Sequence, residues 1–233
     1  MLRFVDAEGS PRAILLDCPP DHREQSLREN IKRCDAILFT HDHVDHTFGL
    51  DEVRRYNALM GSPIEVYADA RTRESLERVF RHIFKRHENV NDSFVADLMP
   101  RTIDVEQPIE LFGVRCTPLR LLHGRLPVLG FRMDAEGDRS DAALFPLAYC
   151  TDLSGIPPAT WKQLRGVRTL VLDMLRYRKH PTHLSLDEAL DVAREVGADR
   201  TVFVHMTHDI RHAELEWKLP AGVQLGFDGM RLS

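Results

Sequence analysis

The chain has 233 residues, of which 43% are hydrophobic and 29% charged, and a formal net charge of −5. This composition is typical of a globular protein with a sizeable core. The negative charge argues against a protein that binds nucleic acid mainly through electrostatics, and there is no run of 18 apolar residues to span a membrane. Because Met1–Asp6 does not have the pattern of a signal peptide, we expect a cytoplasmic protein with no membrane partner.

Strand and helix patterns alternate along the chain. The predicted strands are 2–6 and 13–17, which form a hairpin, then 36–40, 64–68, several strands within 101–150, 169–174, 201–205 and 223–227. The predicted helices are 21–34, 49–59, an amphipathic segment over 76–84, 158–164, 185–196 and 212–219. No linker-like stretch interrupts them. We therefore predict one domain over 1–233, with a layered α/β fold of two sheets and helices outside.

Residues 41–46 read His-Asp-His-Val-Asp-His and directly follow the apolar strand Ala36–Thr40. Imidazole and carboxylate groups are ligands of zinc, manganese and iron. His41 and His43 are two residues apart and can point the same way in an extended segment, whereas Asp45 and His46 diverge. The spacing therefore offers one ligand pair to each of two metals. A polar turn with Asp45 as a helix N-cap is an alternative, but it leaves three histidines unexplained.

Three further metal-competent side chains stand at the ends of predicted strands. His123 ends the run 114–122, Asp152 ends the run 144–151, and His205 ends the run 201–204. Any one of them alone could be an ordinary loop residue. Together with residues 41–46 they predict a shared metal site.

Two other features have a simpler interpretation. The four cysteines lie in or beside apolar segments, so we expect them to be reduced and buried rather than zinc ligands. Basic side chains follow one face of the amphipathic segment and could meet a phosphate or RNA; a solvated face is the favoured interpretation. These side chains are Arg71, Arg73, Arg78, Arg81, Lys85 and Arg86.

The pattern H-x-H-x-D-H, followed by His, Asp and His at successive strand ends, resembles the metallo-β-lactamase superfamily. The phrases 181–185 (PTHLS) and 205–208 (HMTH) are most similar to its phosphodiesterase branch, which contains phosphoribosyl 1,2-cyclic phosphate phosphodiesterase. The resemblance implies an αββα sandwich with two divalent metal ions. It places His41, His43 and His123 on the first ion, Asp45, His46 and His205 on the second, and Asp152 between them.

The resemblance also implies a catalytic acid. His183 stands 22 residues before His205, followed by Leu184 and Ser185, as in that branch. We count Asp45 as catalytic as well as metal-binding. One feature departs from the family, whose members usually open with a strand that ends in a Gly-rich turn, often followed by zinc-binding cysteines. Neither occurs before Ala13, so we expect either a truncated open reading frame or a first strand that is absent or replaced.

These residues predict a dinuclear metal-dependent phosphodiesterase that acts on a small cyclic or activated phosphodiester. Metal-activated hydroxide would attack phosphorus, and His183 would protonate the leaving group. Arg125 and Arg178 are candidate substrate-binding residues, and Asp17 and Asp42 could orient ligand imidazoles or make turns.

The alternatives are an RNA-processing nuclease, a non-hydrolytic protein similar to one of pyrroloquinoline quinone biosynthesis, and a lactonase or thioesterase on the same scaffold. For the metals we expect zinc or manganese, with iron or nickel also compatible. For partners we expect a small-molecule substrate and no nucleic acid. The oligomeric state stays open, and a homodimer is compatible with the sequence.

Overall fold

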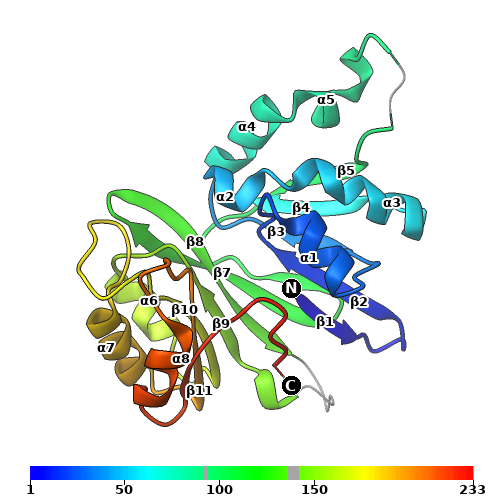
Figure 1. Ribbon diagram of the computed structural model, residues 1–233. Helices are drawn as coiled ribbons and strands as arrows, with labels where there is room; N and C mark the ends of the chain where they lie inside the picture. Colours follow the sequence, from blue (N-terminus) through cyan, green and yellow to red (C-terminus); the bar gives the residue numbers. More distant parts are fainter. Residues whose placement is uncertain (92–93, 136–141, 233) are drawn as a thin grey trace. The chain divides into compact units, whose positions relative to one another are not determined.

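The computed structural model describes residues 1–91, 94–135 and 142–232. Contacts divide the chain into two compact units, Met1–Asp104 and Val105–Ser233, and each unit contains a β-sheet (Figure 1). Among the described residues, each unit also has a cluster of buried hydrophobic side chains. The predicted class, mixed α/β with two helix-flanked sheets, is confirmed. The single domain over 1–233 stays a prediction. No helix within the described residues has the length and apolarity needed to cross a bilayer.

The sheet of the first unit has the strand order β1-β2-β3-β4-β5. β1 and β2 form the predicted antiparallel hairpin, and β2 to β5 are parallel. β3 is buried at every position, as expected for a central strand of a parallel sheet. The strands are β1 (Leu2–Val5), β2 (Pro11–Leu16), β3 (Ala36–Leu38), β4 (Ile64–Ala68) and β5 (Leu98–Thr102). The helices are α1 (His22–Arg28), α2 (Val44–Thr47), α3 (Arg54–Met60), α4 (Ala70–Val79) and α5 (Arg81–Phe84).

Two predicted helices of this unit are shorter or interrupted in the structure. The helix predicted over 21–34 ends at Arg28, and Asn30 has a left-handed φ of +51° that a helix cannot continue through. The amphipathic segment 76–84 belongs to two helices, because Phe80 leaves helical geometry with φ −104° and ψ 42°. Leu76, Phe80 and Ile83 are nevertheless buried, whereas Val79 is 42% exposed, so the spacing predicted only part of the buried face.

The sheet of the second unit has the order β12-β11-β10-β9-β8-β7-β6. β6 to β9 form an antiparallel meander, and β9 to β12 are parallel. The carboxyl ends of β9, β10 and β11 therefore lie at one edge of this sheet. The strands are β6 (Ile109–Leu111), β7 (Val114–His123), β8 (Leu126–Ala135), β9 (Leu147–Cys150), β10 (Thr169–Asp173), β11 (Arg200–Val204) and β12 (Val223–Leu225). The helices are α6 (Pro158–Gln163), α7 (Leu186–Val196) and α8 (His212–Leu215).

The start of α7 has the predicted capping box. The Ser185 backbone N–H donates to Glu188 Oε2 at 3.0 Å, and Gly197 ends the helix with φ +66°. Ala189 and Ala193 are buried and belong to the core of this unit. The capping box fixes the direction in which residues 180–185 enter the helix.

The four cysteines are free and buried, as predicted. Burial disfavours the thiolate, so it raises the pKa of Cys34, Cys116 and Cys150 to about 12 and that of Cys18 well above its usual value. All four thiols are therefore protonated at neutral pH.

Candidate metal centre

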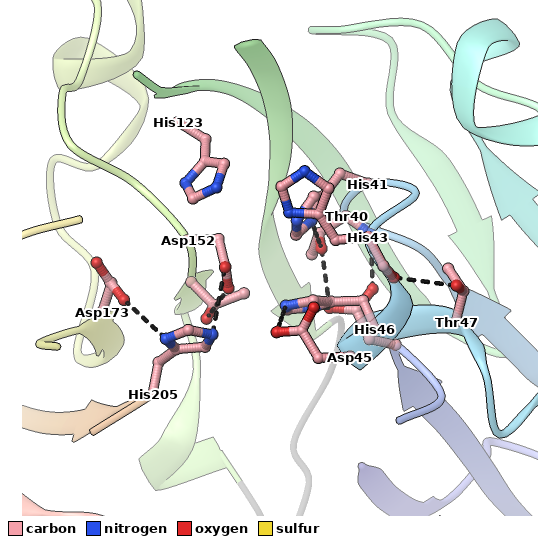
Figure 2. A network of polar contacts seen from close by, with 12 residues as sticks. Thr40, His41, His43, Asp45, His46, Thr47, His123, Asp152, Asp173 and His205 are labelled. Atoms are coloured by element: carbon pink, nitrogen blue, oxygen red, sulfur yellow. Dashed lines mark hydrogen bonds and ion pairs between the residues drawn. The ribbon is translucent and has the colours of Figure 1, made fainter. Parts of the chain in front are cut away.

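In the first unit, the imidazoles of His41, His43 and His46 lie close together where the chain passes from β3 into α2 (Figure 2). The ring centroid of His41 lies 4.4 Å from that of His43 and 4.3 Å from that of His46. Asp45 Oδ2 lies 3.5 Å from His46 Nε2. The N-cap of α2 is His43, and Asp45 lies inside the helix, so the alternative interpretation of Asp45 as N-cap is wrong.

Asp17 holds this loop in place. It follows β2 directly and has a left-handed φ of +57°. Its Oδ1 accepts the Thr40 backbone N–H at 2.8 Å, and its Oδ2 lies 2.8 Å from both the Thr40 hydroxyl and His46 Nδ1. A carboxylate only accepts, so His46 donates through Nδ1, and this tautomer makes Nε2 a potential metal ligand. The predicted role of Asp17 in orienting an imidazole is confirmed for His46.

Thr40 sets the tautomer of His41 in the same way. The Thr40 hydroxyl donates its one proton to Asp17, so its oxygen accepts from His41 Nδ1 at 2.9 Å. In His41, too, Nε2 is therefore the potential ligand atom. Asp42 instead forms an ion pair with Arg71 at 3.8 Å. Among the contacts described for it, none reaches an imidazole, which favours the alternative role of Asp42 in the turn.

In the second unit, His123 ends β7 and its Nδ1 donates to the Thr182 carbonyl at 2.8 Å. This bond again makes Nε2 the potential ligand atom. Gly124 permits the approach of the two loops, because a Cβ at this position would lie 2.9 Å from Thr182 Cγ2. Its φ of +63° also favours glycine.

Asp152 and His205 follow β9 and β11, and both have left-handed backbones, with φ +53° and +65°. Their side chains meet: Asp152 Oδ1 lies 3.3 Å from His205 Nε2 (Figure 2). Non-glycine residues adopt this conformation at a cost, and such residues concentrate at functional sites. The strand ends are thus shaped to present these two side chains.

Asp173 is a site residue that the sequence analysis missed. It is the last residue of β10 and is completely buried. Its Oδ2 accepts the Leu184 N–H at 3.0 Å, and its Oδ1 lies 3.3 Å from His183 Nδ1 and 3.7 Å from His205 Nδ1. The segment 169–174 was predicted only as a buried strand. An acidic residue ending a strand between those of Asp152 and His205 is the pattern that could have identified it.

His183 lies among these groups. Its ring centroid is 4.6 Å from that of His123 and 4.8 Å from that of His205. It belongs to two sets of potential metal ligands whose ligand atoms lie within 4.8 Å of one another: one with His123 and Asp152, the other with Asp173 and His205. The geometry is compatible with a ligand or an acid, and the acid role stays a prediction.

The candidate donors fit divalent metal ions. All are imidazole nitrogens or carboxylate oxygens, the ligands preferred by zinc, manganese and iron. Hydrogen bonds to the Nδ1 atoms of His41, His46 and His123 already fix the tautomer that metal binding requires. How these donors divide between two ions stays a prediction.

The two candidate substrate-binding arginines are exposed side chains of the second unit. Arg125 lies in the turn between β7 and β8. Arg178 lies in a loop braced by Arg176, which donates to the carbonyl oxygens of Arg178 and Lys179 at 3.2 and 3.1 Å. Their contact with substrate stays a prediction.

The family model described as the beta-lactamase superfamily domain matches residues 12–206, and the chain belongs to this family. The solved structure of a new diphosphatase from the PhnP family has 38% sequence identity and a TM-score of 0.82, over 95% of this chain and 79% of that one. The predicted family, and its similarity to this phosphodiesterase branch, are confirmed.

Two curated proteins are also similar. An octanoyltransferase of Porphyromonas gingivalis is 30% identical over 226 residues, which cover 94% of this chain. This chain spans only 42% of the length of that protein. A ribonuclease Z of Methanopyrus kandleri is 26% identical over 237 residues, covering 86% of this chain and 78% of that protein. Metal-dependent hydrolases are therefore among the similar proteins.

Proposed function

We propose that this chain is a dinuclear metal-dependent phosphodiesterase for a small cyclic or activated phosphodiester. The observation that carries the proposal is the hydrogen bond at Nδ1 of His41, His46 and His123, which fixes the tautomer whose Nε2 can coordinate a metal. The similarity to a PhnP-family diphosphatase supports the reaction class. The proposed ligands of the two ions, taken from both units, are His41, His43, Asp45, His46, His123, Asp152 and His205.

Bound divalent ions would neutralise the phosphoryl oxygens and activate the attacking water. The chain's own residues supply the remaining steps. Asp173 accepts from His183 Nδ1 and so orients the ring, and His183 in its protonated form would donate from Nε2 to the leaving alkoxide. Asp45, with an exposed carboxylate, would orient the attacking water. Arg125 and Arg178 would contact the phosphate.

A ribonuclease is the second candidate, favoured by the similarity to ribonuclease Z. The stripe of six basic side chains over residues 71–86 gives it little support. Five of its six side chains pair with acidic groups: Arg71 with Asp42, Arg73 with Glu77, Arg81 and Lys85 with Glu88, and Arg86 with Asp97. Such a surface has a weaker attraction for a polyanion than the sequence alone indicates.

A substrate panel tests the proposal. Protein reconstituted with zinc, manganese, nickel or cobalt is assayed on bis(p-nitrophenyl) phosphate, p-nitrophenyl phosphate, a lactone and precursor tRNA. We expect turnover of the diester and little of the monoester, since the diester offers one negative charge and a leaving group for His183. Lactone hydrolysis without diesterase activity, preferred cleavage of tRNA, or metal binding without any turnover would each contradict it.

Two variants distinguish a metal ligand from a catalytic acid. His205→Ala should lose or weaken one metal. His183→Ala should keep both metals and lose roughly 10²–10⁴-fold in rate on a diester with a poor leaving group. With p-nitrophenolate as leaving group the loss should shrink, because this group needs no proton. His208→Ala, a fully exposed control, should change neither. Loss of metal from His183→Ala would make His183 a ligand.

A further inference from the structure

His180 is a histidine of the second unit to which the proposed reaction gives no role. It stands three residues before His183, in the loop that leads into α7. The ring centroids of the two histidines are 5.2 Å apart, and the ring planes are inclined by 46°. Among the described residues, His180 nevertheless belongs to no group of potential metal ligands, whereas His183 belongs to two. His180 therefore lies beside the candidate metal centre without being one of its potential ligands.

The hydrogen bonds of His180 fix the opposite tautomer from that of the three histidines whose Nδ1 atoms donate. The Thr182 backbone N–H donates to His180 Nδ1 at 3.4 Å, and the Thr182 hydroxyl lies 3.1 Å from the same atom. A backbone N–H only donates, so Nδ1 is an unprotonated acceptor and the neutral ring carries its proton on Nε2. Burial is the main cause that lowers the pKa of His180, which favours this neutral ring. The Nδ1 atom thus serves the loop rather than a metal.

The contact between His180 and Thr182 closes a tight turn. Asn and Asp side chains make the same turn when they accept a backbone N–H two residues further on. Pro181 lies between the two residues, and it has a fixed φ and no N–H of its own. On its other side, Thr182 packs closely on Gly124, where a Cβ would lie 2.9 Å from Thr182 Cγ2. Thr182 is therefore held between His180 and Gly124.

Through Thr182 the turn reaches a proposed metal ligand. The Thr182 carbonyl accepts from His123 Nδ1 at 2.8 Å. The same residue thus gives its N–H and hydroxyl to His180 and its carbonyl to His123. A rotation of Thr182 that broke the contact with His180 would also redirect this carbonyl. The two imidazoles are therefore linked through one residue.

We propose that His180 is a positioning residue: by holding Thr182 it keeps the Thr182 carbonyl aligned with His123 Nδ1, and so prepares His123 Nε2 for a metal. This inference rests on the proposed function, in which His123 is a ligand, and it adds a residue that binds neither metal nor substrate. The competing explanation is a turn that stabilises the fold alone. That explanation predicts lower stability on loss of His180 but an unchanged affinity for metal.

The zinc affinity of His180→Ala, measured by competition with a chromophoric chelator, separates the two explanations. Removal of the acceptor should weaken zinc binding roughly 10-fold, the lower end of the range for residues that orient metal ligands. His180→Asn should restore the affinity to within a few fold of the wild type, because asparagine accepts a backbone N–H two residues on and favours a turn before proline. His208→Ala, which removes a 96% exposed imidazole of the same unit, should bind zinc as the wild type does.

Nitrogen NMR spectra of the metal-free proteins add a readout that needs neither zinc nor substrate. The Nδ1 proton of His123 should exchange slowly with water in the wild type and in His180→Asn, and faster in His180→Ala. Wild-type zinc affinity in His180→Ala, even with a lower Tm, would overturn the inference, and so would an equal loss in His180→Asn. A protein without diesterase activity that shows these effects would refute the proposed function alone. If the wild type bound no zinc, the proposed function would fail, and the exchange of the His123 proton would still decide the inference.

Discussion

At the scale of single residues, the site is organised by groups that bind no metal in our proposal. Asp17 and Thr40 fix the orientation of His46 and His41, and Thr182 fixes that of His123. Such partners keep the ligand atom deprotonated and correctly aimed, so their loss usually weakens metal binding by 10- to 100-fold.

Asp17→Asn should therefore lower metal affinity by about 10- to 100-fold. Asparagine tolerates the left-handed backbone at this position, so the change removes charge and acceptor capacity while the turn is kept. Competition with a chromophoric chelator measures the affinity. Asp42→Asn is the matched control, since Asp42 pairs with Arg71, and it should retain the wild-type affinity within a few fold. Equal losses in the two variants would contradict the role of Asp17.

The candidate ligands were predictable because a metal donor is recognisable from residue type and from its place at a strand end. Asp173 was not, because its role comes from contact with His183 and His205, ten and more residues away in sequence. The contact of Asp42 could not be predicted for the same reason. Sequence places it between two histidines, yet the turn of the loop directs its carboxylate toward Arg71.

At the scale of elements, α1 and α3 share a buried polar contact that the sequence did not indicate. His22 Nε2 lies 3.1 Å from the Tyr56 hydroxyl, which lies 2.7 Å from Ser26 Oγ. Burial is the main cause that lowers the pKa of His22 to about 4, and the N-terminal amino group adds to it, whereas Asp21 opposes it. α1 and α3 therefore pack around an imidazole that is neutral at pH 7.

This contact predicts a pH dependence of stability. His22 takes up a proton near pH 6.5 in the unfolded chain and near pH 4 in the folded chain. The contribution of neutral His22 to the free energy of unfolding is therefore fully present above pH 6.5 and decreases as the pH drops toward 4. Between pH 7 and 5 the free energy of unfolding should fall by about 2 kcal/mol from this group. Urea unfolding of the wild type and of His22→Gln at both pH values isolates the contribution of His22 to the free energy of unfolding. His87→Gln, an exposed control, should follow the wild type; an unchanged slope in His22→Gln would refute the assignment.

Strands and capped helices were the most predictable elements. β4 has the predicted bounds and the capping box of α7 is present, because both depend on local patterns. The end of α1 and the break at Phe80 depend on backbone angles at single positions that periodicity does not encode.

At the scale of the whole molecule, the proposed ligands come from both compact units, so metal binding should stabilise both. At a free metal concentration of 100 times Kd, a ligand adds about 2.7 kcal/mol to the free energy of unfolding. Removal of metal by a chelator should lower the Tm. It should also increase hydrogen exchange in residues 36–47 of the first unit and around β9, β10 and β11 of the second.

If hydrogen exchange increased in only one unit, the result would contradict the proposal that residues of both units bind the metal ions. Matched samples of His205→Ala serve as the control, because a variant with a weakened site should respond less to the chelator. A concerted response would support the prediction of one domain over 1–233.

The left-handed residues at the strand ends imply a trade-off between heat resistance and activity. Asp17, Asp152 and His205 each hold a backbone conformation that costs a non-glycine residue about 1 kcal/mol or more. Selection for stability alone would replace such residues with glycine, and selection for activity keeps them. A drifting lineage that no longer needed the reaction would therefore be expected to lose these three side chains early, while its core and its strands persisted.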